Sequence, residues 1–183
     1  LARLHHPNVV GVLDVGRLGP ATTPGTADLA GRMCLAMELA QCSLLDVLGS
    51  ARWPLVSACA HDLLDGLAHV GARGLVHSDI KPSNVLLMDD RRGVVAALSD
   101  FGAWASSAQA TGGRAGTIGY VPPDFAARPP SPDLDLYALG VTLAQLVAGG
   151  ALPDPAEARE RWRDRVGAAL VRIDAPPQLL GWL

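Results

Sequence analysis

The spacing of apolar residues along the chain predicts three helices of different character. Residues 54–72 carry apolar side chains at helical intervals and end before Gly74, which predicts an amphipathic helix that faces a core. Residues 133–148 are apolar almost all round, so this helix is expected to be buried among other helices. Residues 155–172 interleave arginine with acidic residues, which predicts a solvated face. A further helix is expected to begin at Pro176.

Short apolar runs between these helices predict β-strands. Residues 9–15 follow a His-His-Pro-Asn sequence that cannot continue a helix, and they are expected to form a strand. Residues 32–38 are apolar enough for a buried strand. Residues 85–88 and 94–98 flank Asp-Asp-Arg-Arg-Gly, a pattern typical of a β-hairpin.

Composition narrows the class of protein. A chain of 183 residues with 49% hydrophobic and 18% charged residues is expected to form one soluble domain with a real core. The net charge of −3 predicts no binding of nucleic acid, and the longest apolar run, residues 138–148, is too short to span a membrane. The three cysteines are odd in number and lack metal-ligand spacing, which favours reduced thiols and a cytoplasmic location.

The chemistry of the chain is concentrated in residues 77–84, His-Ser-Asp-Ile-Lys-Pro-Ser-Asn, with Asp-Phe-Gly at residues 100–102. Of the 15 lysine and arginine residues, 14 are arginine, and Lys81 is the only lysine. Asn84 is one of only two asparagines. The scarce residue types therefore fall within the octet. This pattern, H-x-D-x-K-x-x-N followed by D-F-G, resembles the catalytic and metal-binding loops of eukaryotic-type protein kinases.

The resemblance implies an α+β, protein-kinase-like fold. Residues 1–40 would be a remnant of the N-lobe, and residues 41–183 would be a mainly helical C-lobe without its last helix. The implied cofactors are ATP and Mg²⁺. Asp79 would be the catalytic base, Lys81 would place its charge on the transferring phosphate, and the Mg²⁺ ligands would be Asn84 and Asp100.

Residues 37–40, Met-Glu-Leu-Ala, resemble the hinge that binds adenine in kinases. Met37 would stand at the gatekeeper position, and the backbone of Glu38, Leu39 and Ala40 would hydrogen-bond the base. Leu86 would form the floor beneath adenine. The alternative interpretation of this segment is the plain end of a buried strand.

Residues 103–121 resemble an activation segment, because they end in a sequence similar to the G-T-x-x-Y-x-A-P-E of Ser/Thr kinases. The resemblance implies that Thr117 hydrogen-bonds Asp79 and Lys81. Ser78 stands where many kinases carry the arginine that receives an activating phosphate. We therefore expect the parent enzyme not to depend on phosphorylation of this segment.

Two further features are implied by the resemblance and concern the scaffold. Asp135 would anchor the backbone of the catalytic loop from the helix at residues 133–148. A hydrophobic spine would be formed by stacking of His77, Phe101, Val12 and Leu1.

The departures from the kinase pattern define the alternatives. Since Lys81 is the only lysine, the chain contains no ATP-phosphate lysine of the kind that kinases carry on an N-lobe strand. We expect a fragment of a protein Ser/Thr kinase that phosphorylates protein hydroxyls and is inactive without its N-lobe. The lysine two residues after Asp79 favours Ser/Thr over Tyr specificity.

Two alternatives to the kinase fragment remain. One is a pseudokinase that acts as a binding or scaffold module. The other is a small-molecule phosphotransferase of the aminoglycoside-kinase type, which shares the H-x-D-x-x-x-x-N loop. The G-T-x-x-Y segment at residues 116–120 argues against the second, because it resembles a peptide-docking loop.

Overall fold

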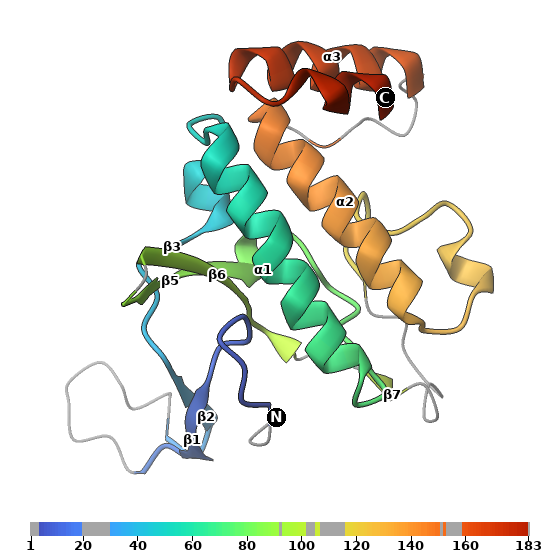
Figure 1. The fold of residues 1–183 in the computed structure, drawn as a ribbon. Helices are drawn as coiled ribbons and strands as arrows, with labels where there is room; N and C mark the ends of the chain where they lie inside the picture. Colours follow the sequence, from blue (N-terminus) through green and yellow to red (C-terminus); the bar gives the residue numbers. More distant parts are fainter. Residues whose placement is uncertain are drawn as a thin grey trace.

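In the computed structural model, the first α-helix packs on a small antiparallel sheet, and two further α-helices follow it in succession (Figure 1). The structure describes residues 4–19, 30–91, 93–101, 105–106, 116–150, 152 and 159–182. The helices are α1 (Trp53–Gly71), α2 (Pro132–Ala148) and α3 (Arg159–Arg172). Helix α2 packs on α1, and α3 packs against α2 at the end remote from the N-terminal strands.

The strands form three small sheets, all antiparallel. The central sheet has the order β3-β5-β6, and the others are the pairs β1-β2 and β4-β7. Their bounds are β1 (Val12–Arg17), β2 (Met33–Met37), β3 (Cys42–Ser43), β4 (Leu75–Val76), β5 (Val85–Asp90), β6 (Gly93–Leu98) and β7 (Ala105–Ser106). Short 3-10 helices are η2 (Leu44–Val47), η3 (Pro82–Asn84), η5 (Phe125–Ala127) and η6 (Pro177–Trp182).

The predicted hairpin is confirmed as β5 and β6. Its register runs from Val85 opposite Leu98 to Asp90 opposite Gly93, so each arm extends further toward the turn than the apolar pattern predicted. Gly93 closes the turn with φ of 119°, a conformation that residues with a side chain rarely adopt. Since neighbouring residues on a strand face opposite ways, one face of the hairpin carries Leu86 and Met88 and the other carries Val85 and Leu87.

The strand predicted at residues 9–15 begins only at Val12, because the residues before it join the hairpin instead. Val10 donates to the carbonyl of Leu98 at 2.9 Å, and Leu98 donates to the carbonyl of Asn8 at 2.9 Å. The Asn8 side chain donates to the carbonyl of Ala96 at 3.0 Å. These bonds pair the outer edge of β6, which would otherwise expose unpaired backbone groups.

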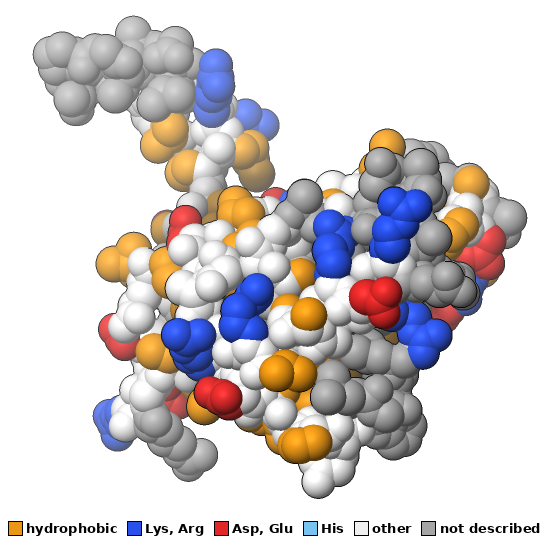
Figure 2. Space-filling view, turned by 90° about the horizontal axis from the view of Figure 1, so that it is seen from above, with side chains coloured by type: hydrophobic (Ala, Val, Ile, Leu, Met, Phe, Trp, Pro, Cys, Tyr) orange, Lys and Arg blue, Asp and Glu red, His pale blue; other side chains and the backbone are white. Residues whose placement is uncertain are grey.

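The prediction that residues 32–38 form a buried strand is wrong in its burial. Strand β2 is present, but Met33 and Leu35 are 65% and 45% exposed, and Leu13 on β1 is 68% exposed. Within the described residues, β1 and β2 pair only with each other, and their ribbon projects from the body of the molecule (Figures 1 and 2). An apolar strand is buried only where other elements cover it.

The positions of the helices agree with the apolar pattern except at the C-terminal end. Helices α1 and α2 begin and end within a residue of their predicted bounds. The prediction that α2 is buried nearly all round is wrong, because Leu136 and Tyr137 are 50% and 41% exposed and the buried residues lie mainly on one face. Helix α3 has exposed arginines opposite the buried Val166, Ala169 and Leu170, as predicted, although residues 155–158 lie outside the described part of the chain. The helix expected from Pro176 is the 3-10 helix η6. No described helix is long and apolar enough to cross a membrane.

Gly66 on α1 allows the close approach of the segment that pairs β6. A Cβ atom at this position would lie 2.7 Å from the carbonyl oxygen of Asn8. We predict that Gly66→Ala lowers the free energy of unfolding by about 1–3 kcal/mol, because one of the two segments must shift. The measurement is the midpoint of urea unfolding.

Gly140→Ala is the matched control for this substitution. Gly140 is an exposed residue inside α2, and an added Cβ would meet no described atom within 4 Å. This variant is expected to gain up to about 1 kcal/mol from helix propensity. Equal stabilisation of the chain by both substitutions would contradict the predicted clash.

Candidate active site

The backbone of the catalytic loop is fixed by one buried carboxylate. Asp135 on α2 is 3% exposed, and its two oxygens accept hydrogen bonds from the N–H groups of His77 at 2.7 Å and Ser78 at 2.8 Å. Burial raises the pKa of Asp135, and the two N–H donors partly offset this shift. Ser78 has φ of 68°, so Asp135 also stabilises an uncommon backbone conformation. The predicted anchor is therefore present.

The side chain of His77 connects the catalytic loop to the segment after β6. It is fully buried, and its Nε2 donates to the carbonyl of Ser99 at 2.8 Å while Nδ1 accepts from the Asp79 N–H at 3.3 Å. These partners define one neutral tautomer, and burial lowers the pKa of His77.

The predicted spine is present in part. The rings of His77 and Phe101 are in contact, with centroids 4.5 Å apart and their planes tilted by 48°. Leu1 lies outside the described residues, and the contact of the half-buried Val12 with this pair stays a prediction. The core cluster that contains Phe101 also contains Leu4.

The carboxylate of Asp79 lies at the centre of the site and accepts three hydrogen bonds. Lys81 Nζ donates to Oδ2 at 2.7 Å, Thr117 Oγ1 donates to Oδ1 at 2.6 Å, and Asn84 Nδ2 donates to Oδ2 at 3.0 Å. Lys81 also donates to Thr117 Oγ1 at 2.9 Å, so both contacts predicted for Thr117 are present. Burial raises the pKa of Asp79, but the bonds from Lys81, Thr117 and Asn84 together lower it below its ordinary value.

Asn84 precedes β5 and Asp100 follows β6, so both flank the open end of the hairpin, as the sequence predicted. The carbonyl of Asn84 accepts bonds from the N–H and the hydroxyl of Ser99, the residue before Asp100. Because Asn84 Nδ2 faces Asp79, its Oδ1 is directed away from that carboxylate. An amide oxygen and a carboxylate suit Mg²⁺, which keeps several water or phosphate ligands. The described residues form no group of three or more His, Cys, Asp or Glu that could hold a metal.

Some of the residues predicted to bind adenine lie together in the structure. Leu86 and Ala40 pack in one small apolar cluster with Val10, Met88 and Ala97. The backbone N–H groups of Leu39 and Ala40 make no hydrogen bond to another described residue, which leaves donors for a bound base. Met37 is 39% exposed and Leu39 is 94% exposed, while the Glu38 side chain accepts a bond from the Gly11 N–H at 2.8 Å.

The sequence did not reveal three residues that organise the site. Ser99 bonds both His77 and Asn84, and its only sequence signal is its place before Asp-Phe-Gly. Tyr120 donates through its hydroxyl to Gln145 on α2, which connects the segment of Thr117 to the same helix that carries Asp135. Residues 103–104 and 107–115 of the predicted activation segment lie outside the described part of the chain.

The hydrogen bond from Thr117 generates a pH-dependent prediction. Because the pKa of Asp79 is lowered in the folded chain, its bonds stabilise the fold above the ordinary carboxyl pKa, and this stabilisation is lost as pH falls. Thr117→Val removes one donor. We expect a higher pKa for Asp79 and a loss of about 1.5 kcal/mol or more at neutral pH, which shrinks in acid.

The measurements are the carboxyl ¹³C titration of Asp79 and urea unfolding at several pH values. Thr117→Ser is the control, because it keeps the hydroxyl that donates to Asp79. An unchanged Asp79 titration in the valine variant would show that the Thr117 bond does not affect this carboxylate.

Comparison with known proteins agrees with this geometry. A family model described as protein kinase domain matches residues 1–172. The chain is 34% identical over 164 residues to serine/threonine-protein kinase pkn2 of Myxococcus xanthus, which is 84% of this chain and 18% of that protein. It is 36% identical over 96 residues to calcium/calmodulin-dependent protein kinase type II of Caenorhabditis elegans, which is 51% of this chain and 13% of that protein. Each match spans less than a fifth of the relative's length. Because the family model covers most of the chain, the chain belongs to the protein kinase domain family.

Proposed function

We propose that this site, in its parent protein, transfers the γ-phosphate of ATP to a serine or threonine hydroxyl of a protein substrate. The observation that carries the proposal is the set of three donors around the Asp79 carboxylate. They hold the carboxylate in one orientation and keep it ionised. One relative is named a serine/threonine-protein kinase and the other a calcium/calmodulin-dependent protein kinase, which supports the same class of reaction.

Asp79 accepts the proton of the attacking hydroxyl in this proposal. Its lowered pKa keeps it ionised at neutral pH, so it orients the substrate hydroxyl through a hydrogen bond and takes the proton as the new P–O bond forms. Lys81 Nζ lies 2.7 Å from the carboxylate. In this proposal its charge also acts on the transferring phosphate. Thr117 hydrogen-bonds both Asp79 and Lys81 and so fixes the position of the two side chains relative to each other.

The remaining residues bind the nucleotide and its metal. Mg²⁺ neutralises charge on the phosphates when it is bound, and the residues that would hold it are Asn84 and Asp100. Ala40 and Leu86 would contact adenine from the apolar cluster they share. The position of Lys81, two residues after Asp79, supports serine and threonine over tyrosine as acceptors.

A second candidate is a non-catalytic pseudokinase module. It is favoured by one observation, the absence of any lysine other than Lys81 from the sequence. Kinases use a second lysine on the phosphates of ATP.

If the parent protein is an active kinase, this second lysine must come from outside this chain. We therefore propose that transfer requires residues of the parent protein that this chain does not contain.

The proposed base generates the third prediction. In the parent protein, Asp79→Asn is expected to lower kcat by about 10²–10⁴-fold, because the amide cannot take the hydroxyl proton. The measurement is transfer of ³²P from labelled Mg·ATP to a library of serine- and threonine-containing peptides. Asp65→Asn, on the exposed side of α1, is the control and should retain activity.

The outcome separates the two candidates. Transfer by the parent protein that is lost in Asp79→Asn supports the kinase. A parent protein that transfers no phosphate to any peptide would leave the pseudokinase module. Full activity in Asp79→Asn would contradict the assignment of this residue as the base.

A further inference from the structure

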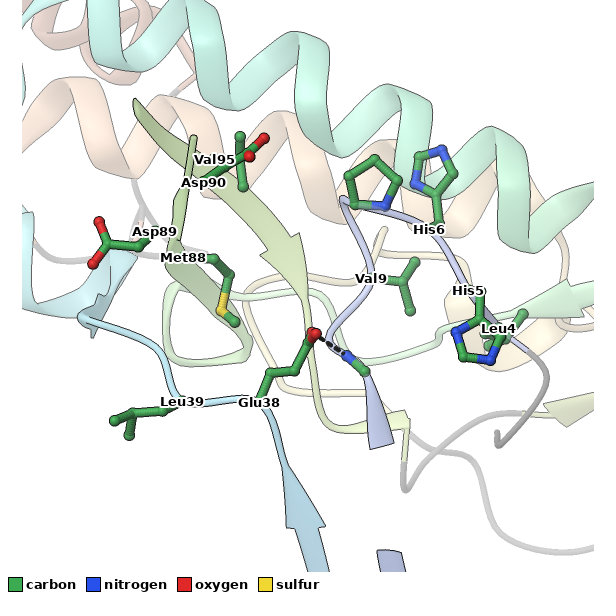
Figure 3. Close-up of a pocket in the computed structure, with 12 residues that line it drawn as sticks. Leu4, His5, His6, Val9, Glu38, Leu39, Met88, Asp89, Asp90 and Val95 are labelled. Atoms are coloured by element: carbon green, nitrogen blue, oxygen red, sulfur yellow. Dashed lines mark hydrogen bonds between the residues drawn. The ribbon is translucent and has the colours of Figure 1, made fainter. Parts of the chain in front are cut away.

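A pocket of about 520 Å³ lies beside the segment that connects β2 and β3 (Figure 3). Its walls come from the turn before β1, from Glu38 and Leu39, and from the β5–β6 hairpin. The volume falls in the range of sites that bind small molecules. None of the residues predicted to take part in catalysis, Asp79, Lys81, Asn84 or Thr117, lines it.

One side of the pocket is apolar. Met88 and Val95 lie opposite each other in the hairpin register, and their side chains contribute to this side together with Leu4 and Val9. Leu4, Val9 and Met88 are each less than 10% exposed, so this side is set by the packed core. An alkyl or similar apolar group placed against it would be removed from water.

The polar side chains of the pocket are the carboxylates of Glu38, Asp89 and Asp90 and the imidazoles of His5 and His6. Glu38 reaches toward the start of β1, where it accepts the Gly11 N–H and keeps its second oxygen available. Asp90 lies on the same face of the hairpin as Met88, beside Val95, and one of its oxygens accepts a bond from the Arg91 N–H. Asp89 also lines the mouth, but it accepts a bond from Gln41.

Within the described residues, no lysine or arginine forms a salt bridge with these carboxylates. The lining residues include no lysine or arginine, and none of the described salt bridges involves Glu38, Asp89 or Asp90. The pocket therefore combines an apolar wall with three carboxylates and no lysine or arginine. Both features are complementary to an organic cation with an apolar body.

We propose that this pocket binds an amphipathic cation, a guanidinium or ammonium group attached to an aliphatic body. The aliphatic part packs on Met88, Val95 and Val9, and the charged head pairs with Glu38, while Asp90 adds to the negative charge of the pocket. Such chemistry is offered by a free organic cation and by adjacent leucine-like and arginine side chains of a peptide. The proposal does not depend on phosphoryl transfer.

The test is calorimetric titration of the chain with n-hexylguanidinium in the absence of nucleotide. Asp90→Asn is expected to weaken binding by about threefold to fivefold, and Glu38→Gln/Asp90→Asn by about tenfold or more. Asp65→Asn, which removes an exposed charge outside the pocket, is the matched control and should bind as the unaltered chain does. Circular dichroism establishes that each variant is folded.

Two ligand controls separate charge from apolar contact. Hexanoate has an apolar tail of similar length with the opposite charge, and methylguanidinium has the charge without the tail. Both should bind at least about tenfold more weakly than hexylguanidinium. Equal binding of hexanoate, or equal binding by the double variant, would overturn the proposal.

The location and source of the ligand are tested in the same experiment. Amide NMR shifts on addition of hexylguanidinium are expected at Gly11 and Val95, and shifts confined to the catalytic loop would overturn the assignment of the site. N-acetyl-leucyl-argininamide is compared with hexylguanidinium. Tighter binding of the dipeptide supports the site with a peptide segment as its ligand, and tighter binding of hexylguanidinium supports it with a free organic cation.

Discussion

The hydrogen bonds from the catalytic loop to the buried carboxylate of Asp135 are the constraint on which the site depends. A buried carboxylate is costly unless donors compensate it, and here the N–H groups of His77 and Ser78 do so. Because Asp135 lies in the first turn of α2, the packing of that helix on α1 sets the position of the loop. Asp79, the next residue along, is thereby placed by the core.

The same helix and the hairpin bring together groups that are distant in sequence. Thr117 contacts Asp79 across 38 positions of the chain, and Tyr120 bonds Gln145 on α2 near the end opposite Asp135. Ser99 connects His77 with Asn84 from the exit of β6. The donors around Asp79 are therefore positioned by the fold, and they hold its carboxylate in one orientation.

One face of the β5–β6 hairpin serves two neighbouring regions. Leu86 packs with Ala40 where adenine is proposed to bind, and Met88, two residues further along, lines the acidic pocket. Glu38 lies in the connecting segment between them, with its side chain in the pocket and its backbone in the predicted hinge. Occupation of the pocket and the geometry of the hinge thus involve the same short segment of chain.

The sequence by itself determined the helices α1 and α2, the hairpin and the chemical identity of the octet at residues 77–84, because periodicity and motif spacing are local properties. It also indicated, through resemblance, the bonds of Thr117 and Asp135. Only the tertiary structure decided that β2 is exposed, that Val10 joins β6 and that a pocket forms beside Glu38. Burial and cavities depend on which distant segments cover a residue, and the composition of that residue's own segment does not specify them.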